Sequence, residues 1–329
     1  DFDHYIIPGF VDLHCHGGGG YDTMLGLSDI QKMATYHLKN GTTTILPTTL
    51  TATLKDTVNA VSGIKDFIKK NKNSTNILGI HLEGPFINPN KLGAQPNFTQ
   101  NPNKDFIEKL IKEAPIKLIT LAPELEGSEE FIEYSEENKI KVQFGHSLAD
   151  CKCCVNIMKK YNIGFTHLYN AMSGNDHRNP GVLSAALTYG EYAEIICDLN
   201  HVSEEAIKIA KKSIKKLYAV TDSIGAAGLK DGDYKFANVN ITKKDDLITL
   251  SNSSTLAGSV ISMHNTFLNL LKIKFSIEEA VEMTSYNASK YLNLNDVGMI
   301  KEGYKSNFVI LDKNYNIKNV YLKGKKINE

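Results

Sequence analysis

The chain has no surplus of charge and no long apolar run. Lysine and arginine together number 37, aspartate and glutamate also number 37, and the formal net charge is zero. A chain without a basic surplus has no broad positive field with which to bind nucleic acid or an anionic membrane surface. No apolar run approaches the roughly 18 residues of a membrane helix, and the first residues do not resemble a signal peptide. We therefore expect a soluble protein that binds any anionic group through local contacts.

Cysteine is also scarce. The chain has five, an odd number without the spacing of a secreted disulfide framework, which favours a reducing compartment. We therefore expect a cytoplasmic location. Three of the five lie in the stretch CKCC at 151–154, which begins a helical pattern and lacks the second cysteine pair of a structural zinc site. The stretch therefore does not predict a cysteine-bound zinc.

What the chain does have is a regular alternation of two patterns. Short β-type runs alternate with helical patterns along most of its length, which is typical of parallel strands joined by helical crossovers. The expected strands are 7–14, 42–47, 76–83, 116–123, 141–146, 164–168, 193–199 and 217–222. Eight strands with seven helical segments between them predict a (β/α)8 barrel of the TIM type.

Two regions depart from this alternation. Residues 231–256 have the pattern of a β-hairpin inserted after the eighth strand, and residues 298–327 alternate apolar and polar side chains, which predicts a half-buried antiparallel sheet. We therefore divide the chain into a barrel domain, 1–297, and the C-terminal part of a small accessory β-sandwich domain, 298–329. So small a sheet needs partner strands. Because residue 1 leads almost directly into the first barrel strand, we expect the N-terminal half of the accessory domain to be missing from this chain.

Side chains that can bind metals recur at the ends of the expected strands. Active sites of (β/α)8 barrels form at the C-terminal ends of the strands, so reactive residues there count for more than elsewhere. A single histidine or carboxylate at such a position is more often a hydrogen-bonded or capping residue. Here, however, six such side chains share one rim: His14, His16, Glu83, His146, His167 and Asp222. Their convergence predicts a metal site.

The stretch HCHGGGG at 14–20 supports this interpretation. Side chains alternate along a strand, so His14 and His16 face the same side while Cys15 faces away. Imidazole and carboxylate ligands together favour zinc, iron or a similar divalent ion over calcium or magnesium, whose sites are mostly oxygen. We interpret the four glycines as a loop whose backbone passes close over the metal centre, in conformations that other residues resist.

Several motifs, taken in order, resemble the amidohydrolase superfamily and, within it, the family of N-acetylglucosamine-6-phosphate deacetylases. They are IPGFVDLHCHG, LGIHLEGPFINPNKLGAQ, THLYNAM, RNPG and VTDSIGAAGL, and the resemblance covers nearly the whole chain. It implies that Glu83, His146 and His167 hold a principal divalent metal ion, and that His14 and His16 help to hold a second. Glu83 takes the position of the modified lysine that bridges two metals in many related enzymes. The resemblance therefore implies a centre of one or two ions, with zinc or iron expected.

The resemblance also implies a set of substrate contacts. His177 and Arg178, in the stretch NDHRNPG, correspond to residues that bind the substrate phosphate, in some members from the neighbouring subunit of a homodimer. Arginine suits this role because its planar fork donates two hydrogen bonds to phosphate. Asn170 and Ala171 correspond to further substrate contacts. His201 resembles a histidine that contacts the sugar or the acetyl carbonyl, although Leu-Asn-His stands here where members often have Gly before Leu-His.

The implied reaction is the metal-dependent removal of acetate from N-acetylglucosamine 6-phosphate, which gives glucosamine 6-phosphate. We expect Asp222 to take a proton as water attacks the acetyl carbon and to return it to the sugar nitrogen, with His201 stabilising the oxyanion. Two alternatives keep the barrel and the metal: the same reaction on N-acetylgalactosamine 6-phosphate, and hydrolysis of a cyclic amide, against which the phosphate-binding stretch argues. A third alternative is a catalytically silent barrel that serves in binding or assembly, and it gives no reason to retain Asp222.

Overall fold

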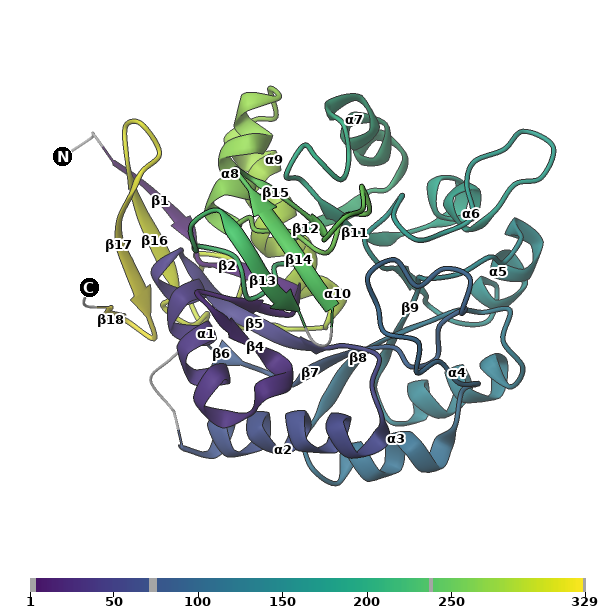
Figure 1. Ribbon diagram of the computed structural model, residues 1–329. Coiled ribbons are helices and arrows are strands. Elements are labelled where there is room, and N and C mark those ends of the chain that lie inside the picture. Colours follow the sequence, from purple (N-terminus) through teal and green to yellow (C-terminus); the bar gives the residue numbers. More distant parts are fainter. Residues whose placement is uncertain (1–3, 71–75, 237–238, 328–329) are drawn as a thin grey trace.

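Parallel strands form a barrel at the centre of the molecule. The computed structural model describes residues 4–70, 76–236 and 239–327 (Figure 1). Within these ranges the barrel strands, in chain order, are β2 (Phe10–Cys15), β5 (Thr42–Thr49), β7 (Ile80–Glu83), β8 (Ile116–Leu121), β9 (Lys141–Phe144), β10 (Gly164–Phe165), β11 (Tyr192–Ile196) and β12 (Lys216–Val220). Six of them are hydrogen-bonded in the order β10-β9-β8-β7-β5-β2, and β11 pairs with β12. All these pairings are parallel.

Backbone hydrogen bonds close the ring at its two remaining gaps. The Leu168 amide donates to the Glu194 carbonyl at 2.8 Å, which joins the segment after β10 to β11. On the other side, the Asp222 amide donates to the His14 carbonyl at 2.9 Å, which joins the segment after β12 to β2. The (β/α)8 barrel expected from the sequence is therefore confirmed.

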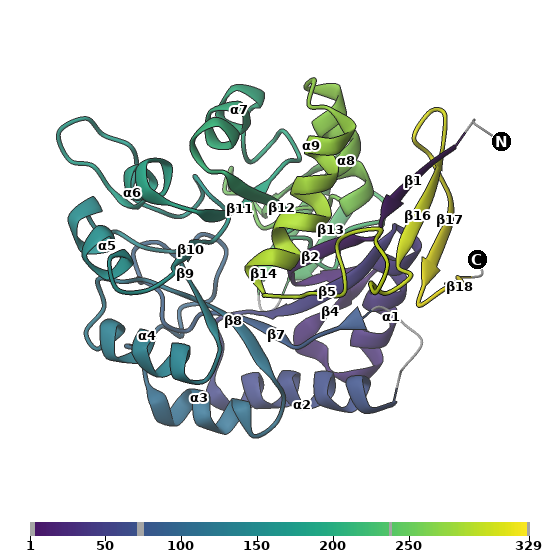
Figure 2. The same cartoon turned by 180° about the vertical axis from the view of Figure 1, so that it is seen from behind.

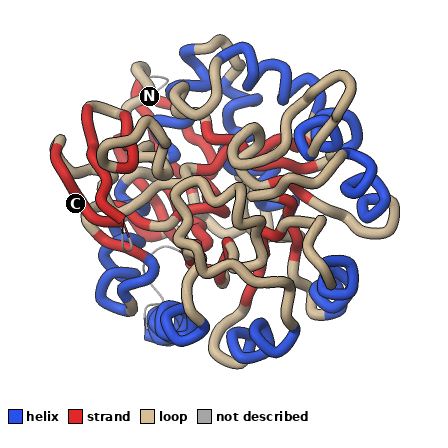
Figure 3. Tube along the Cα trace, turned by 45° about the vertical axis from the view of Figure 1, so that its right-hand side comes forward, coloured by secondary structure: helices blue, strands red, loops and turns tan. Residues whose placement is uncertain are grey.

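Helices cover the outside of the barrel, where they surround the strands in Figure 3. In the described part of the chain they are α1 (Leu27–Lys39), α2 (Leu54–Lys70), α3 (Lys104–Ile111), α4 (Ser128–Glu137), α5 (Cys151–Met158), α6 (Val182–Tyr189), α7 (Glu204–Ser213), α8 (Met263–Lys272), α9 (Ile277–Val281) and α10 (Asn287–Tyr291). A 3-10 turn, η1 (Thr23–Leu25), precedes α1, and a π-helical segment, η2 (Glu282–Tyr286), joins α9 to α10. Among the described residues, no helix combines the length and the apolar character that crossing a membrane would require.

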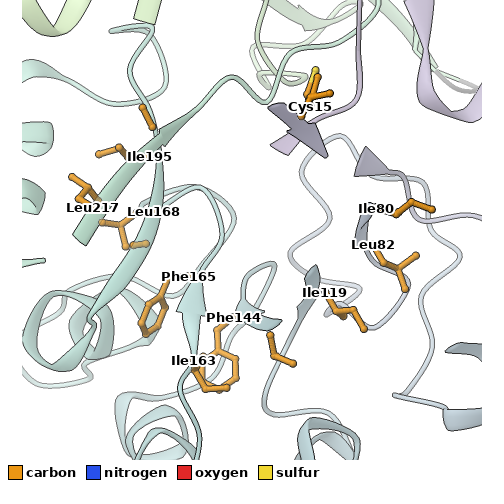
Figure 4. Packing of buried hydrophobic residues seen from close by; sticks show 14 of the residues in the cluster. Cys15, Ile80, Leu82, Ile119, Phe144, Ile163, Phe165, Leu168, Ile195 and Leu217 are labelled. Carbon is orange, nitrogen blue, oxygen red and sulfur yellow. The ribbon is translucent and has the colours of Figure 1, made fainter. Parts of the chain in front are cut away.

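Apolar side chains at regular spacing join these helices to the strands. In α2 the buried positions include Ala60, Ile64 and Phe67, which lie on one face because three or four residues make one helical turn. Phe144 of β9 and Phe165 of β10 lie side by side in the same core cluster, with ring centroids 6.0 Å apart (Figure 4). Burial of one such side chain contributes about 1.5–3 kcal/mol. The barrel is thus a packed scaffold that can hold side chains at its rim in fixed positions.

The first expected strand is two strands with different partners. β1 (His4–Pro8) pairs antiparallel with β16 (Phe308–Asp312), whereas β2 belongs to the barrel. Gly9 separates them, and a Cβ there would lie 2.2 Å from Thr43 Oγ1, so the backbone turns directly against β5. The sheet continues through β17 (Ile317–Leu322) to β18 (Lys325–Lys326), and Figure 2 shows β1, from the start of the chain, beside the C-terminal strand β16.

This four-stranded sheet is antiparallel throughout, as the C-terminal alternation predicts. Within the described residues the accessory domain has this one sheet, and residues 4–8 belong to it rather than to the barrel. The expected further strands upstream of this chain, and the division of the chain at residue 297, stay predictions.

The insertion after β12 has three strands rather than the two of a hairpin. β13 (Gly232–Phe236), β14 (Val239–Lys244) and β15 (Leu247–Leu250) form an antiparallel sheet. A tight turn with Asp245 at a φ of 53° reverses the chain once more. Phe236, Ile241 and Ile248 are buried in one cluster with residues of the barrel rim, so this sheet packs over the C-terminal end of the barrel.

Three further short strands complete the sheets. β3 (Gly17–Gly18) and β4 (Tyr21–Asp22) form a small antiparallel pair directly after β2. β6 (Asn76–Ile77) pairs with β5, so the single expected strand 76–83 is divided into β6 and β7.

Candidate metal centre

The predicted ligands lie at or just beyond the C-terminal ends of the barrel strands. His14 lies in β2, His16 follows that strand, and Glu83 is the last residue of β7. Three more lie two residues beyond β9, β10 and β12, and their φ angles are 49° at His146, 28° at His167 and 49° at Asp222. This left-handed region costs a residue with a side chain roughly 1–2 kcal/mol. Such strain persists only where the surroundings hold it, and it is concentrated at functional sites.

Glu83, His146 and His167 form a compact group, here called the Glu83 trio. Glu83 Oε1 lies 3.1 Å from Nε2 of His146 and 3.1 Å from Nε2 of His167. The two Nε2 atoms are 3.0 Å apart. All three side chains are buried, and their ligand atoms lie within 4.8 Å of one another. The Glu83 trio could therefore hold a metal ion.

His14, His16 and Asp222 form a second group, here called the Asp222 trio. The Nε2 atoms of His14 and His16 are 3.2 Å apart, and Asp222 Oδ1 lies 3.4 Å from the first and 3.3 Å from the second. Glu83 joins the two trios, because its other oxygen, Oε2, lies 3.1 Å from His16 Nε2. The arrangement could hold one ion or two, with Glu83 between them.

Contacts outside the centre fix which ring nitrogen faces it. Three rings donate Nδ1–H to an outer oxygen: His14 to the Glu194 carboxylate at 2.9 Å, His16 to the Thr48 carbonyl at 3.1 Å and His146 to the Lys91 carbonyl at 2.7 Å. These oxygens only accept, so each neutral ring presents its Nε2 lone pair to the centre. In their neutral forms His14 and His16 bring two such Nε2 atoms to 3.2 Å from each other, an arrangement that a cation bound between them stabilises. The donor set therefore fits a divalent metal.

The charges within the centre shift the pKa values of its members. Burial lowers the pKa of His16, but the Asp222 and Glu83 carboxylates outweigh burial and raise this pKa to about 9. Burial raises the pKa of Asp222, but the charges of His14 and His16 lower it to about 2. For the same reasons the pKa of His14 is well above its usual value and that of Glu83 is well below. The centre thus stabilises positive charge, which is the electrostatic condition for binding a cation.

Members of both trios line a cavity of about 300 Å³. The same cavity is lined by Asn170, Ala171 and His201, which are three of the predicted substrate contacts. Its apolar lining includes Leu50, Phe236 and Leu256, from the segments after β5, in β13 and after β15. Apart from the fully buried His14, the predicted metal ligands, Asp222 and these three residues therefore lie together around one space.

His201 is held by a neighbouring carboxylate. Its Nδ1 lies 2.6 Å from Asp198 Oδ2, and its backbone amide donates to Asp198 Oδ1 at 2.8 Å. Burial lowers the pKa of His201, but Asp198 raises it above the usual value. Its Nδ1–H donates to Asp198, so Nε2 carries a proton that it can donate to a ligand in the cavity when the ring is protonated, the form that the raised pKa favours.

His177 and Arg178 lie outside this cavity. They belong to the exposed loop 174–181 before α6, which projects from the barrel in Figure 1, and the His177 side chain is 79% exposed. Asp176 accepts hydrogen bonds from the amides of Arg178 and Asn179, which shapes the loop tip. Arg178 is the only arginine of the chain; the other basic residues are lysines. Within one chain the structure does not bring the predicted phosphate contacts to the centre, because their loop points outward.

The four glycines after His16 do not pass over the centre. A Cβ on Gly17 would lie 2.6 Å from the backbone nitrogen of Gly225, in the segment after β12, and Gly19, with a φ of 67°, packs against Tyr36 of α1. The close approach and the positive φ expected of this loop are present. These two features let the loop pack against the segment after β12 and against α1, rather than against the metal-binding side chains.

Sequence reasoning missed three residues near the centre. The Gln95 side chain donates to Glu83 Oε2, Phe236 has its ring centroid 5.8 Å from that of His16, and Glu194 contacts His14. The charge of Glu194 within the apolar stretch YAEII was a usable signal, since a buried strand rarely carries an unpaired carboxylate. Gln95 and Phe236 lie in a loop and in the inserted sheet, whose paths the sequence does not give.

Residues 5–327 match the sequence profile of the amidohydrolase family. The chain belongs to the amidohydrolase family. Amidohydrolases are metal-dependent hydrolases, so this chain is a hydrolytic enzyme, and its clustered histidines and carboxylates could bind the metal.

Individual amidohydrolases resemble this one over nearly its whole length. N-acetylglucosamine-6-phosphate deacetylase of Bacillus subtilis (strain 168) is 36% identical over 321 residues, which cover 94% of this chain and 81% of the relative. N-acetylgalactosamine-6-phosphate deacetylase of Escherichia coli O157:H7 is 29% identical, covering 97% of this chain and 86% of the relative. The crystal structure of N-acetylglucosamine-6-phosphate deacetylase from Thermotoga maritima superposes with a TM-score of 0.91 at 33% identity, covering 98% of this chain and 88% of that one.

Proposed function

We propose that this amidohydrolase removes the acetyl group of N-acetylglucosamine 6-phosphate to give glucosamine 6-phosphate and acetate. The observation that carries the proposal is the pair of trios joined by Glu83 beside a cavity that also contains Asp222 and His201. The similarity to deacetylases that bear this name supports the choice of substrate. The five unpaired cysteines support the cytoplasmic location expected from the sequence.

The Glu83 trio would hold the principal ion, and His14 and His16 would help to hold a second, with zinc or iron the expected metal. When bound, such an ion supplies Lewis acidity, which polarises a carbonyl oxygen and makes water easier to deprotonate near neutral pH. The outer hydrogen bonds of the histidines hold their Nε2 lone pairs ready for this role.

Asp222 moves the proton in this proposal. Its carboxylate lines the cavity, and a pKa of about 2 keeps it ionised at neutral pH. It can therefore accept a proton from the water that attacks the acetyl carbon. The same carboxyl group then gives this proton to the sugar nitrogen as the C–N bond breaks and acetate leaves.

His201 and the segment at 170–171 orient the substrate. With Nδ1–H donated to Asp198 and the ring kept protonated by that carboxylate, His201 donates Nε2–H to the acetyl oxygen as negative charge develops on it. Asn170 and Ala171, which also line the cavity, contact the sugar, and Phe236 with Leu256 supplies an apolar wall. These contacts hold the amide in line with Asp222.

The phosphate contact requires a second copy of the chain. Because His177 and Arg178 lie on an outward loop, we propose a homodimer in which each copy extends this pair to the 6-phosphate in its partner's cavity. The composition supports a specific role, since one arginine stands among the 37 basic residues and lies at the tip of this loop. A guanidinium binds phosphate with two parallel hydrogen bonds, which lysine cannot do.

The second candidate substrate is N-acetylgalactosamine 6-phosphate, because a relative with that activity in its name covers 97% of this chain. The two sugars differ in configuration at C4, far from the acetamide. The same catalytic residues would therefore act on both.

The test is acetate release by the metal-analysed protein from both 6-phosphorylated N-acetyl amino sugars and from unphosphorylated N-acetylglucosamine. We expect the highest kcat/KM with N-acetylglucosamine 6-phosphate, loss of activity with a chelator and recovery with zinc or iron. A higher kcat/KM for the galactosamine isomer would favour the second candidate. No acetate release from either phosphorylated sugar by metal-loaded protein would refute both.

A further inference from the structure

A buried carboxylate lies behind the centre. Glu194 belongs to β11, and its side chain is fully buried. An ionised carboxylate is costly to bury unless hydrogen-bonding or charged partners compensate for the lost water. The partners of Glu194 therefore indicate what it does.

One oxygen of Glu194 contacts both halves of the centre. Its Oε2 accepts hydrogen bonds from Nδ1 of His14, at 2.9 Å, and from the backbone amide of His167, at 3.2 Å. His14 belongs to the Asp222 trio and His167 to the Glu83 trio. The second contact holds the backbone at a residue whose φ is 28°. The other oxygen, Oε1, accepts from the Tyr218 hydroxyl at 3.5 Å.

His14 differs from the other two rings of the two trios whose Nδ1 contacts an oxygen. His16 and His146 donate to neutral backbone carbonyls, whereas His14 donates to a charged carboxylate. A carboxylate partner fixes the tautomer and the orientation of an imidazole and makes its other nitrogen a stronger metal ligand. The contact with Glu194 therefore strengthens His14 at Nε2, the atom that faces His16 and Asp222.

We propose that Glu194 is a positioning residue that sets how tightly the Asp222 trio holds its metal ion. The inference rests on the proposed metal-dependent function, but it concerns ion binding rather than turnover. Glu194→Gln keeps the size of the side chain and an acceptor oxygen while it removes the charge. We expect this change to lower the affinity for one of two bound ions by about 10–100-fold. The ion at the Glu83 trio changes little, because the Gln oxygen still accepts from the His167 amide.

The test is a zinc titration of the metal-free full chain in competition with a chromophoric chelator. It compares the wild type with Glu194→Gln, with His16→Ala and with the double variant. His16→Ala removes a ligand of the Asp222 trio, so this variant should retain only the ion at the Glu83 trio. Glu194→Gln should therefore lower the affinity for one ion in the wild-type background. In the His16→Ala background it should leave the affinity for the retained ion unchanged. Tyr218→Phe is the matched control: it removes a buried hydroxyl beside Glu194 Oε1 but leaves the contact with His14, so both ions should bind as in the wild type.

Three results would overturn the proposal. They are wild-type affinity for every bound zinc in Glu194→Gln, an equal loss in the His16→Ala background, and the same loss in Tyr218→Phe. A wild-type chain that binds no zinc would refute the proposed function as well, so the two failures are distinguishable.

A second measurement needs no variant. In wild-type protein with 15N-labelled histidine, the Nδ1 proton of His14 is expected to exchange slowly and to resonate at low field, because it is buried against a carboxylate. Folded protein without such a signal would contradict the contact on which the proposal depends.

Discussion

At Asp222 a single carboxylate contacts two imidazoles and also lines the cavity. Its charge therefore serves both the stability of the centre and the proposed proton transfer. A substitution that keeps the hydrogen-bonding shape but removes the proton-accepting oxygen separates these two roles.

We expect Asp222→Asn to lower kcat by about 10²–10⁴-fold, because the amide cannot accept the proton of the attacking water. The fold and the ion at the Glu83 trio should remain, since Asp222 is not one of that trio's ligands. The measurement is acetate release at saturating substrate, with circular dichroism and metal content as controls. Near-normal turnover by folded, metal-loaded Asp222→Asn would rule out this role.

We expect metal binding at the Asp222 trio to release protons, so that the affinity falls as the pH falls. The pKa of His16 is raised from 6.5 to about 9 by its carboxylate neighbours, so at neutral pH the metal-free ring carries a proton that a metal must displace. This raised pKa stabilises the metal-free fold fully below pH 6.5, and that contribution is lost as the pH rises through about 9.

Calorimetric titration with zinc at neutral pH, in buffers of different ionisation enthalpy, measures this proton release. At least one proton should leave for each ion bound at the Asp222 trio. Binding enthalpies that do not depend on the buffer would contradict the prediction. His16→Ala is the control, because it should abolish the share of the release that belongs to this ring.

The six predicted rim residues could be found from the sequence because the ends of parallel strands share one edge of a barrel. Their order along the chain then does not matter. Gln95 and Glu194 could not be found in this way. Gln95 reaches Glu83 from a loop, and Glu194 reaches His14 only because β11 lies next to the segment that carries His167. The sequence indicates which side chains can act as metal ligands. Which further residues contact those ligands depends on the path of the chain.

At the scale of elements, the loop 174–181 carries the contact that we propose distinguishes a phosphorylated substrate from a plain amino sugar. We expect Arg178→Ala to raise KM for the 6-phosphorylated substrate by about 10–100-fold, the effect of a lost hydrogen bond between charged groups. KM for the unphosphorylated sugar should not change. Arg178→Lys should recover only part of the loss, because an ammonium cannot form the paired contact.

Steady-state kinetics on the phosphorylated and unphosphorylated sugars measure this difference. Lys112→Ala, at the end of α3, is the control for loss of an exposed positive charge elsewhere. Equal changes in KM for the two substrates would show that Arg178 does not bind the phosphate.

Most elements follow from local patterns in the sequence, and the exceptions have physical causes. The alternation of runs predicted the barrel strands, but the break at Gly9, which assigns β1 to the accessory sheet, depends on a close approach to Thr43. The third strand of the insertion depends on a turn at Asp245 with a positive φ, which aspartate tolerates better than most residues. Both are contacts or conformations that hydrophobic periodicity does not record.

At the scale of the whole molecule, the proposed homodimer makes a prediction that a monomeric enzyme does not. In a mixture of Asp222→Asn and Arg178→Ala chains, each mixed dimer has one cavity with an intact Asp222 and an intact Arg178 from its partner. Random reassociation should therefore restore about a quarter of wild-type activity at low substrate concentration. Each variant alone should stay close to inactive under those conditions.

The control for this experiment is a mixture made without dissociating the two variants, which should show no recovery. Activity that equals the sum of the separate variants after subunit exchange would mean that Arg178 acts within its own chain, or that the chain does not form this dimer. The family resemblance already implied this homodimer, which stays a prediction, whereas the outward direction of the loop is visible only in the folded chain.

The single arginine on an exposed loop also makes the chain unusually simple to cut. A protease specific for arginine has one possible site, the peptide bond after Arg178, and exposed loop tips are where nicking is favoured. The two fragments should stay associated, because contacts that cross the cut remain: the segment after β10 stays hydrogen-bonded to β11, and β1 stays paired with β16. Brief proteolysis would therefore open the loop while leaving every candidate metal ligand in place, and protection of this one bond by a phosphorylated sugar would report binding without any substitution in the chain.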